Sequence, residues 1–283
     1  SRLKDYLNNS LKGFVMGVAE IIPGISGGTV ALVLGIYERL IFAISQFNLD
    51  LLRKIKGGFF KEACSQVDLN FLLSLFVGMI FAIFSLSSLL SFLLSSYEVF
   101  FKFFLTGLLL SALFLDEIRP MAANKNIFFG VLCSALIGFI LFGSPVMEIE
   151  SPNFIFVFLS GFIAICALVL PGISGSFILL LIGIYPVIIN AVRDLDIFIL
   201  ITFSLGCLAG LLSIVRLVKI IYEKNRNLMR GFFFGLILFS IPLLWKQASF
   251  TIAFPSIMDN YFEVLVGVSL GISLILLLEK IRA

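Results

Sequence analysis

The sequence predicts an all-α polytopic membrane protein built from two inverted repeats, each with one broken, re-entrant helical hairpin plus three transmembrane helices. Three observations carry this prediction. Of the 283 residues, 60% are hydrophobic and only 13% are charged, with a mean hydropathy of +1.16, whereas soluble domains are about 45–50% apolar and about 25% charged. Apolar runs of membrane-spanning length recur along the chain, and two further runs are interrupted copies of each other.

The composition also excludes several classes of function. The chain has no histidine, so it has no imidazole for general-base catalysis, for a phosphohistidine intermediate or for binding zinc. Its four cysteines are scattered singly, which is typical of small apolar packing residues rather than of metal or redox sites. The formal net charge of +3 forms no basic stripe, so we expect no nucleic-acid partner, no metal and no cofactor.

The first hairpin is predicted over residues 11–44, with a break at Pro23–Gly27. As helices, the arms Leu11–Ile22 and Thr29–Ile44 would reach about 18 and 24 Å, against about 30 Å of hydrocarbon. We therefore expect a re-entrant hairpin, although two full crossings would return its ends to the same face as well.

The second hairpin, residues 159–192, repeats the first at an offset of 148 residues. Fifteen positions are identical in this register, including two Pro-Gly-Ile-Ser-Gly runs and two Gly-Ile-Tyr triplets. Compositional bias matches scattered Leu and Ile, but it does not align two such motifs at once. The chain therefore contains an internal repeat.

Six further runs are long and apolar enough, or nearly so, to cross a bilayer as helices. They are Phe71–Leu94, Val99–Leu115, Ile127–Gly143, Ile197–Val218, Met229–Trp245 and Phe262–Leu278. Between the first hairpin and the first span, Gln46–Asp68 mixes Lys and Arg with Leu, Ile and Phe. This segment is predicted to be an interfacial cytoplasmic helix, with a plain connector as the alternative.

Three spans between the two hairpins bring the second hairpin in from the opposite face, which predicts the inversion. Placing both termini in the cytoplasm puts 17 Lys and Arg inside and only Lys102, Arg193 and Lys246 outside, as the positive-inside rule requires. The loop of residues 144–153, with Glu148 and Glu150 and no base, then lies outside. We expect one transmembrane domain over residues 1–283, with repeats at 11–143 and 159–278.

The two breaks are the candidate site. Proline and glycine stop a helix, and its free end groups need partners other than lipid. New half-helices starting near Gly27 and Gly175 would present amides toward an anion, with hydroxyls from Ser26, Thr29, Ser174 and Ser176. The alternative is that the breaks only permit close helix packing. Two breaks entering from opposite faces favour a binding site at membrane depth.

A few charged residues accompany these breaks. Glu20 is the only carboxylate deep within an apolar run, so it is a candidate to bind H⁺ or Na⁺, or else to bond to hairpin amides. Its counterpart is Leu168, which makes the site asymmetric. Arg39 near the inner face, and Lys102 and Arg193 near the outer face, are candidates to attract a phosphate or to snorkel to the interface.

The runs Ala19–Thr29 with Gly35–Arg39, and Leu170–Phe177 with Gly183–Tyr185, resemble the PopT family of bacterial membrane proteins, formerly of unknown function. The resemblance covers nearly the whole chain. It implies movement of undecaprenyl phosphate, a polyprenyl phosphate, from the outer to the cytoplasmic leaflet of the bacterial inner membrane. Mapped onto this sequence, the motif implies site residues Glu20, Ser26, Gly27, Gly28, Thr29, Arg39, Ser174, Gly175 and Ser176. A departure stands at Pro186, where the first copy has Glu38.

The resemblance implies a transporter and not an enzyme, with a membrane lipid as its partner. From the paired breaks and Glu20 we expect alternating access with H⁺ or Na⁺ coupling. Three alternatives stay open on the residues alone: a small-anion or solute secondary transporter, an intramembrane lipid-phosphate enzyme, and a membrane scaffold. The sequence also leaves the oligomeric state open, with a homo-oligomer as one alternative.

Overall fold

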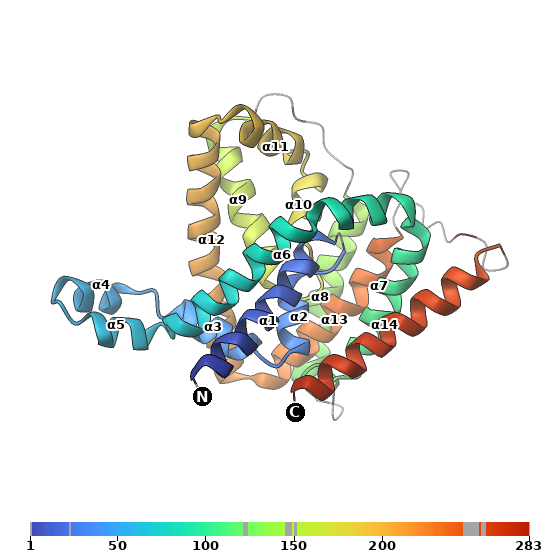
Figure 1. Ribbon diagram of the computed structural model, residues 1–283, viewed down its shortest axis with the longest axis horizontal. Coiled ribbons are helices and arrows are strands. Elements are labelled where there is room, and N and C mark those ends of the chain that lie inside the picture. The colour runs from blue at the N-terminus through green and yellow to red at the C-terminus, as the bar shows by residue number, and fades with distance from the viewer. Residues whose placement is uncertain are drawn as a thin grey trace.

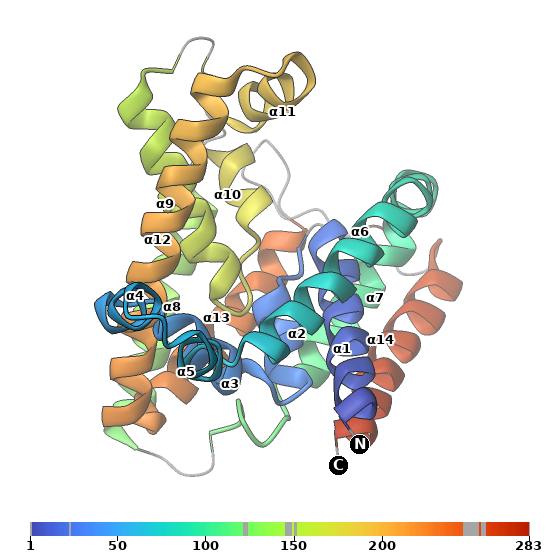
Figure 2. The same ribbon diagram turned by 60° about the vertical axis from the view of Figure 1, so that its left-hand side comes forward.

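The computed structural model describes residues 2–22, 24–120, 124–144, 149, 152–245, 255 and 259–282. Within them the chain forms fourteen helices and no strand (Figures 1 and 2). The amino and carboxyl termini lie at one end of the molecule, and α11 (Tyr185–Asp194) lies at the other (Figure 1). Pro23, Glu148, Glu150 and Lys246, which enter the sequence predictions, lie outside the described residues.

Five long apolar helices confirm five of the six predicted spans. They are α6 (Leu69–Ser96), α8 (Lys125–Gly143), α12 (Ile197–Lys224), α13 (Arg226–Leu244) and α14 (Tyr261–Arg282). The sixth, predicted over Val99–Leu115, is the shorter α7 (Glu98–Ala112). At 1.5 Å per residue, its 15 residues reach about 22 Å, which is less than the hydrocarbon thickness.

Each hairpin contains three helices where two arms were predicted. The first has α1 (Arg2–Ile21), α2 (Gly27–Val33) and α3 (Tyr37–Ser45), and the second has α9 (Phe154–Val169), α10 (Gly175–Leu181) and α11. The prediction of one continuous helix after each break was therefore wrong. In the second hairpin, α10 and α11 meet at an angle of 106°.

The extra stop comes from the glycine of each Gly-Ile-Tyr triplet. Gly35 has φ +67° and Gly183 has φ +76°, in the left-handed region that glycine adopts without steric cost. The Gly35 amide donates to the carbonyl of Leu32 (3.0 Å), and the Ile36 amide donates to the carbonyl of Ala31 (2.9 Å). Gly183 and Ile184 repeat both bonds in the second copy, so both half-helices end in the same Schellman motif.

Four helix pairs build the body of the molecule: α1 with α6, α9 with α12, α7 with α14, and α8 with α13. Glycines permit the close approach. A Cβ atom at Gly13 would collide with the backbone of Leu75, and one at Gly161 would collide with the carbonyl of Phe203. Small residues serve this purpose at helix interfaces in lipid. The pairings correspond between the two halves, as expected for related repeats, and the inversion of the second half stays a prediction.

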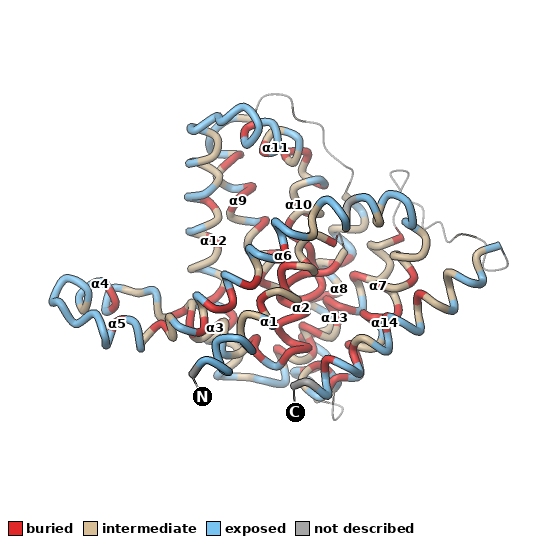
Figure 3. Tube along the Cα trace, viewed as in Figure 1, coloured by how far each residue is buried: buried red, intermediate tan, exposed pale blue. Residues whose placement is uncertain are grey.

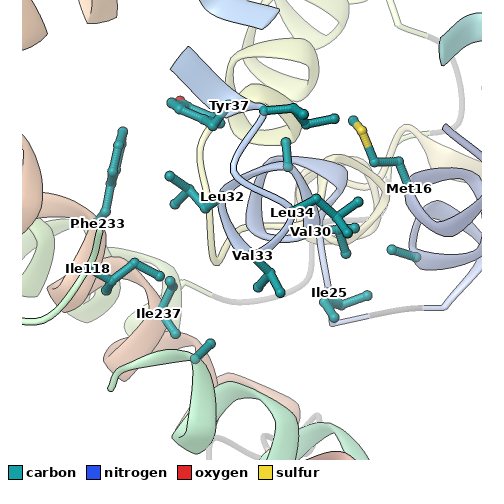
Figure 4. Packing of buried hydrophobic residues seen from close by; sticks show 14 of the residues in the cluster. Met16, Ile25, Val30, Leu32, Val33, Leu34, Tyr37, Ile118, Phe233 and Ile237 are labelled. Atoms are coloured by element: carbon teal, nitrogen blue, oxygen red, sulfur yellow. The ribbon is translucent and has the colours of Figure 1, made fainter. Parts of the chain in front are cut away.

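The core surrounds the first hairpin. All seven residues of α2 are buried, and burial is concentrated around α1 and α2 in Figure 3. Figure 4 shows the side chains of α2 and Tyr37 beside Phe233, Ile118 and Ile237. The first break is therefore held at the centre of the molecule.

A small helical hairpin projects from the side of the body (Figure 1). It consists of α4 (Leu49–Lys56) and α5 (Phe60–Gln66), where one interfacial helix over Gln46–Asp68 was predicted. Gly58, with φ +78°, lies in the turn that separates them. The second repeat has no such insertion, since α12 begins three residues after α11 ends.

Candidate functional site

The two breaks contact each other inside the molecule. The Thr29 hydroxyl accepts a hydrogen bond from the Gly172 amide (2.8 Å), and the Ser26 hydroxyl donates to the carbonyl of Leu170 (3.2 Å). The Tyr37 hydroxyl donates to the carbonyl of Val169 (3.2 Å). We call this contact between the Ser26–Thr29 segment and residues Val169–Gly172 the junction. It brings together motifs that lie 148 residues apart in the sequence.

The backbones approach closely at the junction because Gly28 has no side chain. A Cβ atom there would lie 2.6 Å from the carbonyl oxygen of Val169, closer than a real Cβ contact allows. The repeat counterpart of Gly28 is Ser176, so this position distinguishes the two copies. The glycine is required for contact between backbones and not for an unusual φ.

The first break is closed by its own protein partners. The Ser26 hydroxyl caps α2 by accepting from the Thr29 amide (3.2 Å), and the two hydroxyls lie 3.1 Å apart. Both residues are fully buried, with 0% exposure. Gly27 and Gly28 are buried as well, and the cavity that Thr29 borders, of about 110 Å³, is lined by apolar residues such as Ile22 and Ile25. We therefore expect an anion to reach these four residues only after the junction opens.

Glu20 takes part in this closure. It lies in the last turn of α1, and its Oε1 accepts from the Gly27 amide at 2.6 Å. A Cβ atom on Gly27 would lie 2.5 Å from the same oxygen, so any larger residue there would displace the carboxylate from this position. The structure thus gives Glu20 the hairpin-amide contact that the sequence left as one of two alternatives.

The second break is built from the same motif and is also buried, with Ser174 8% exposed, but its serine borders a cavity. Ser174 is the N-cap residue of α10, yet its side chain makes no capping bond. Instead its hydroxyl lies 2.9 Å from that of Ser176. Ser174 lines a cavity of about 500 Å³ together with Gly172 and Ile173. Gly175 lies against α9, where a Cβ atom would meet the carbonyl oxygen of Ala164 at 2.8 Å.

The cavity combines apolar walls with a few polar groups. The end of α6 and helices α7, α10 and α13 supply apolar side chains that include Leu94, Phe101, Phe177 and Leu244. Glu98, Lys102, Ser174 and Ser240 are the polar and charged residues among the described lining residues. Such a lining suits an amphiphile with an apolar chain and an anionic or polar head.

Two of the three candidate cations lie elsewhere. The Arg39 Nε donates to the Asp68 carboxylate (2.7 Å), and its guanidinium lies 4.1 Å from the centre of the Phe71 ring. Arg193 is exposed and pairs with its neighbour Asp194 (2.9 Å). Neither lines the cavity, whereas Lys102 does.

Sequence reasoning missed Glu98 and Ser240 as members of the site. Glu98 precedes Lys102 by four residues, and the two form an ion pair of 2.7 Å on α7. This spacing was the available signal, because residues i and i+4 lie on one face of a helix. Ser240 lies within an apolar span, and its hydroxyl donates to the carbonyl of Ile237, so nothing in the local pattern distinguished it.

Known proteins share this sequence over most of its length. The model of the undecaprenyl phosphate translocase-like family matches residues 16–255. A polyprenyl-phosphate transporter of Vibrio cholerae serotype O1 is 35% identical over 243 residues, which cover 85% of this chain and 78% of that protein. A polyprenyl-phosphate transporter of Staphylococcus aureus is 28% identical over 295 aligned positions, which cover 97% and 96% of the two chains. Among solved structures, no significant match exists.

The family match spans both breaks and helices α2 to α13, so the resemblance stated from the motifs is confirmed. The chain, a multi-pass helical membrane protein, belongs to the undecaprenyl phosphate translocase-like family.

Proposed function

We propose that the protein carries polyprenyl phosphate, specifically undecaprenyl phosphate, from the outer to the cytoplasmic leaflet of the bacterial plasma membrane, where the carrier lipid is used again. The observation that carries this proposal is the pairing of a closed junction with an adjoining cavity that is apolar on most sides and polar at Ser174. The names of the relatives supply the substrate class.

The physical task is to move only the head group through the protein. A polyprenyl tail is as apolar as the membrane interior, so it can stay in lipid while the phosphate crosses. The phosphate monoester carries about −1.5 to −2 charges at neutral pH, and hydrocarbon offers it no hydrogen-bond partner. Ser174, with Ser176 beside it, supplies hydroxyl donors, and the apolar walls accommodate the first prenyl units.

The junction is the barrier in this mechanism. Its bonds keep Ser26 and Thr29 buried away from the cavity that Gly24 and Ser174 line, so the head group would advance when the second repeat moves against the first. Opening the junction would expose Ser26, Gly28 and Thr29, and release of Glu20 would free the amide of Gly27, so that they could receive the phosphate from Ser174. Arg39, on the first hairpin and outside the cavity, would meet it near the cytoplasmic face.

Coupling to H⁺ or Na⁺ is assigned to Glu20. Moving one negative charge toward a negative cytoplasm costs about 2.3 kcal/mol per 100 mV, which a lipid gradient or a co-transported cation must offset. Glu20 is the acidic residue at the closed break, bonded to Gly27. Protonation or Na⁺ binding would weaken that bond and so link the cation to opening of the junction.

The test is reconstitution into liposomes that carry undecaprenyl phosphate, with a leaflet-specific readout of the lipid at several pH and Na⁺ values. We expect protein-dependent translocation that a Ser26→Ala, Ser174→Ala double variant reduces. Release of inorganic phosphate would instead indicate a lipid-phosphate enzyme. Absence of translocation by the folded wild type under every gradient would overturn the proposal.

A further inference from the structure

Lys102 and Glu98 form an ion pair at the edge of the cavity. The Lys102 Nζ lies 2.7 Å from Oε1 of Glu98, and the two side chains are 32% and 67% exposed. Of the described residues that line the cavity, Lys102 is the only cation and Glu98 the only anion. The one positive charge among these lining residues, the Lys102 ammonium group, is therefore already paired with a carboxylate.

The lysine is held in place and the glutamate is not. Lys102 Nζ lies 5.8 Å from the centre of the Trp245 ring, and that tryptophan is only 2% exposed. The Trp245 Nε1 donates to the Thr106 hydroxyl (3.1 Å), which in turn donates to the carbonyl of Lys102 (2.7 Å). Glu98 lies in the first turn of α7 with most of its side chain exposed, so it can turn away without disturbing the core.

We propose that Glu98 is a placeholder for the phosphate: it neutralises Lys102 while the cavity is empty, and the incoming lipid phosphate displaces it. The proposal rests on the proposed function and adds to it the residue that binds the head group and the residue that competes with it. A phosphate carries more charge than a carboxylate and offers three acceptor oxygens, so it displaces an exposed, weakly held partner.

The exchange also accounts for release. An ammonium group that faced an apolar cavity without a competitor would hold the phosphate tightly and slow its departure. Because Glu98 is four residues away on the same helix, it returns to Lys102 as soon as the phosphate moves toward the junction. The pair therefore favours phosphate lipids over neutral polyprenols without trapping them.

Arg193 provides the matched control. It is the other described cation assigned to the outer face, it pairs with the adjacent Asp194, and it does not line the cavity. A general attraction of anionic lipid to outer-face charge would involve both cations. A specific site involves Lys102 alone.

The experiment measures binding of farnesyl phosphate, a short prenyl monophosphate, to the purified full-length protein in nanodiscs, with farnesol and inorganic phosphate as comparison probes. We expect Lys102→Gln to weaken farnesyl phosphate binding about tenfold, because a charge-assisted hydrogen bond is lost. Glu98→Gln should tighten it severalfold, because the competitor is gone. Farnesol binding should stay unchanged in both, and Arg193→Gln should match the wild type.

Opposite signs for the two variants are the signature of exchange. Equal or absent effects of Lys102→Gln and Glu98→Gln, equal shifts for farnesol, or an equal loss in Arg193→Gln would overturn the proposal. Lys102→Arg, which keeps the charge, should retain binding and shows that loss in Lys102→Gln is not misfolding. Inorganic phosphate that bound as tightly as farnesyl phosphate would contradict a site built for a lipid. If the wild type translocates lipid but the variants do not show these opposite shifts in binding, the exchange alone is refuted. If the variants show the shifts but the wild type does not translocate lipid, the proposed function is refuted.

Discussion

The two breaks share the motif Pro-Gly-Ile-Ser-Gly, yet the serine of the first is closed in the junction, whereas the serine of the second lines a cavity. Their backbones match: Gly24 and Gly172 have φ +96° and +86°, and both half-helices run for seven residues. Their surroundings differ, since every residue of α2 is buried, whereas the buried residues of α10 are Gly175, Ile178 and Leu181. The motif therefore fixes the backbone, and the neighbouring residues decide what the break can bind.

Three substitutions between the copies explain the difference. Glu20, which closes on the Gly27 amide, is replaced by Leu168, which has no acceptor. Thr29, which bonds to Gly172, is replaced by Phe177, which lines the cavity. Gly28 is replaced by Ser176, whose side chain would not fit against the opposite backbone. These differences leave the serine of the first break in the junction and the serine of the second on the cavity.

We expect the largest effect on stability and transport from Gly28→Ser, which gives the first break the serine that the second break has at the corresponding position. In Gly28→Ser, the new Cβ atom meets the carbonyl of Val169, and overpacking of this kind costs about 1–3 kcal/mol. We expect a lower thermal unfolding temperature and loss of translocation. Gly143→Ser is the control, because nothing lies within 4 Å of a Cβ atom there. Equal stability of the two variants would show that the backbones are not in contact.

Thr29→Val removes the hydroxyl that joins the breaks while keeping the shape of the side chain. The Gly172 amide then loses its acceptor in a buried position, at a cost of about 2 kcal/mol. We expect reduced stability by thermal unfolding, together with faster opening of the junction. Thr202→Val is the comparison, since that exposed hydroxyl bonds only to its own helix at Phe198. A loss in Thr29→Val no larger than in Thr202→Val would argue against the junction.

Two substitutions at Glu20 distinguish the structural role of its carboxylate from the role of its negative charge. Glu20→Leu copies Leu168 and leaves the Gly27 amide without its acceptor, for which we expect a loss of about 1–2 kcal/mol. Glu20→Gln keeps a carbonyl acceptor, so its stability should stay near that of the wild type. Its translocation rate, measured in liposomes, should no longer depend on pH or Na⁺. An unchanged cation dependence in Glu20→Gln would remove this residue from coupling.

We expect the smallest effect on stability from replacing the corresponding serines of the two breaks, Ser26 and Ser174, one at a time. Ser26 caps α2 and Ser174 does not cap α10, so Ser26→Ala should cost about 1 kcal/mol and Ser174→Ala less than about 0.5 kcal/mol. Ser174→Ala should instead weaken binding of farnesyl phosphate. Thermal unfolding and a binding titration on both variants check the two parts. The reverse order of stability would mean that the second serine is the structural one.

Much of the fold follows from local pattern. Apolar length predicted α6, α8, α12, α13 and α14 closely, because burial in lipid depends on composition over some 20 residues. The breaks were predictable from Pro23–Gly27 and Pro171–Gly175. The second helix end, at Gly35 and Gly183, could not be predicted in the same way. Glycine is common within apolar membrane helices, so the sequence does not distinguish a glycine that ends a helix with a left-handed φ from one that only permits close packing.

The site was less predictable because its contacts are remote. That Ser26 bonds to Leu170, and Thr29 to Gly172, depends on how two segments more than 140 residues apart pack together. The local motif predicts the same role for Ser26 and Ser174. Only the tertiary structure shows that Ser26 is bonded within the junction and that Ser174 lines the cavity. The cavity itself is formed by residues of four separate helices and of both breaks, so no single segment of the sequence predicts it.

The most direct test is thiol labelling of Ser26→Cys and Ser174→Cys, each in a background without the four native cysteines, with and without polyprenyl phosphate. We expect Ser174→Cys to react in the empty protein and to be protected by the lipid, whereas Ser26→Cys should react only when the lipid drives opening. Equal reactivity of the two thiols in the empty protein, or no response of either to the lipid, would contradict a closed break that opens for a head group held at the other.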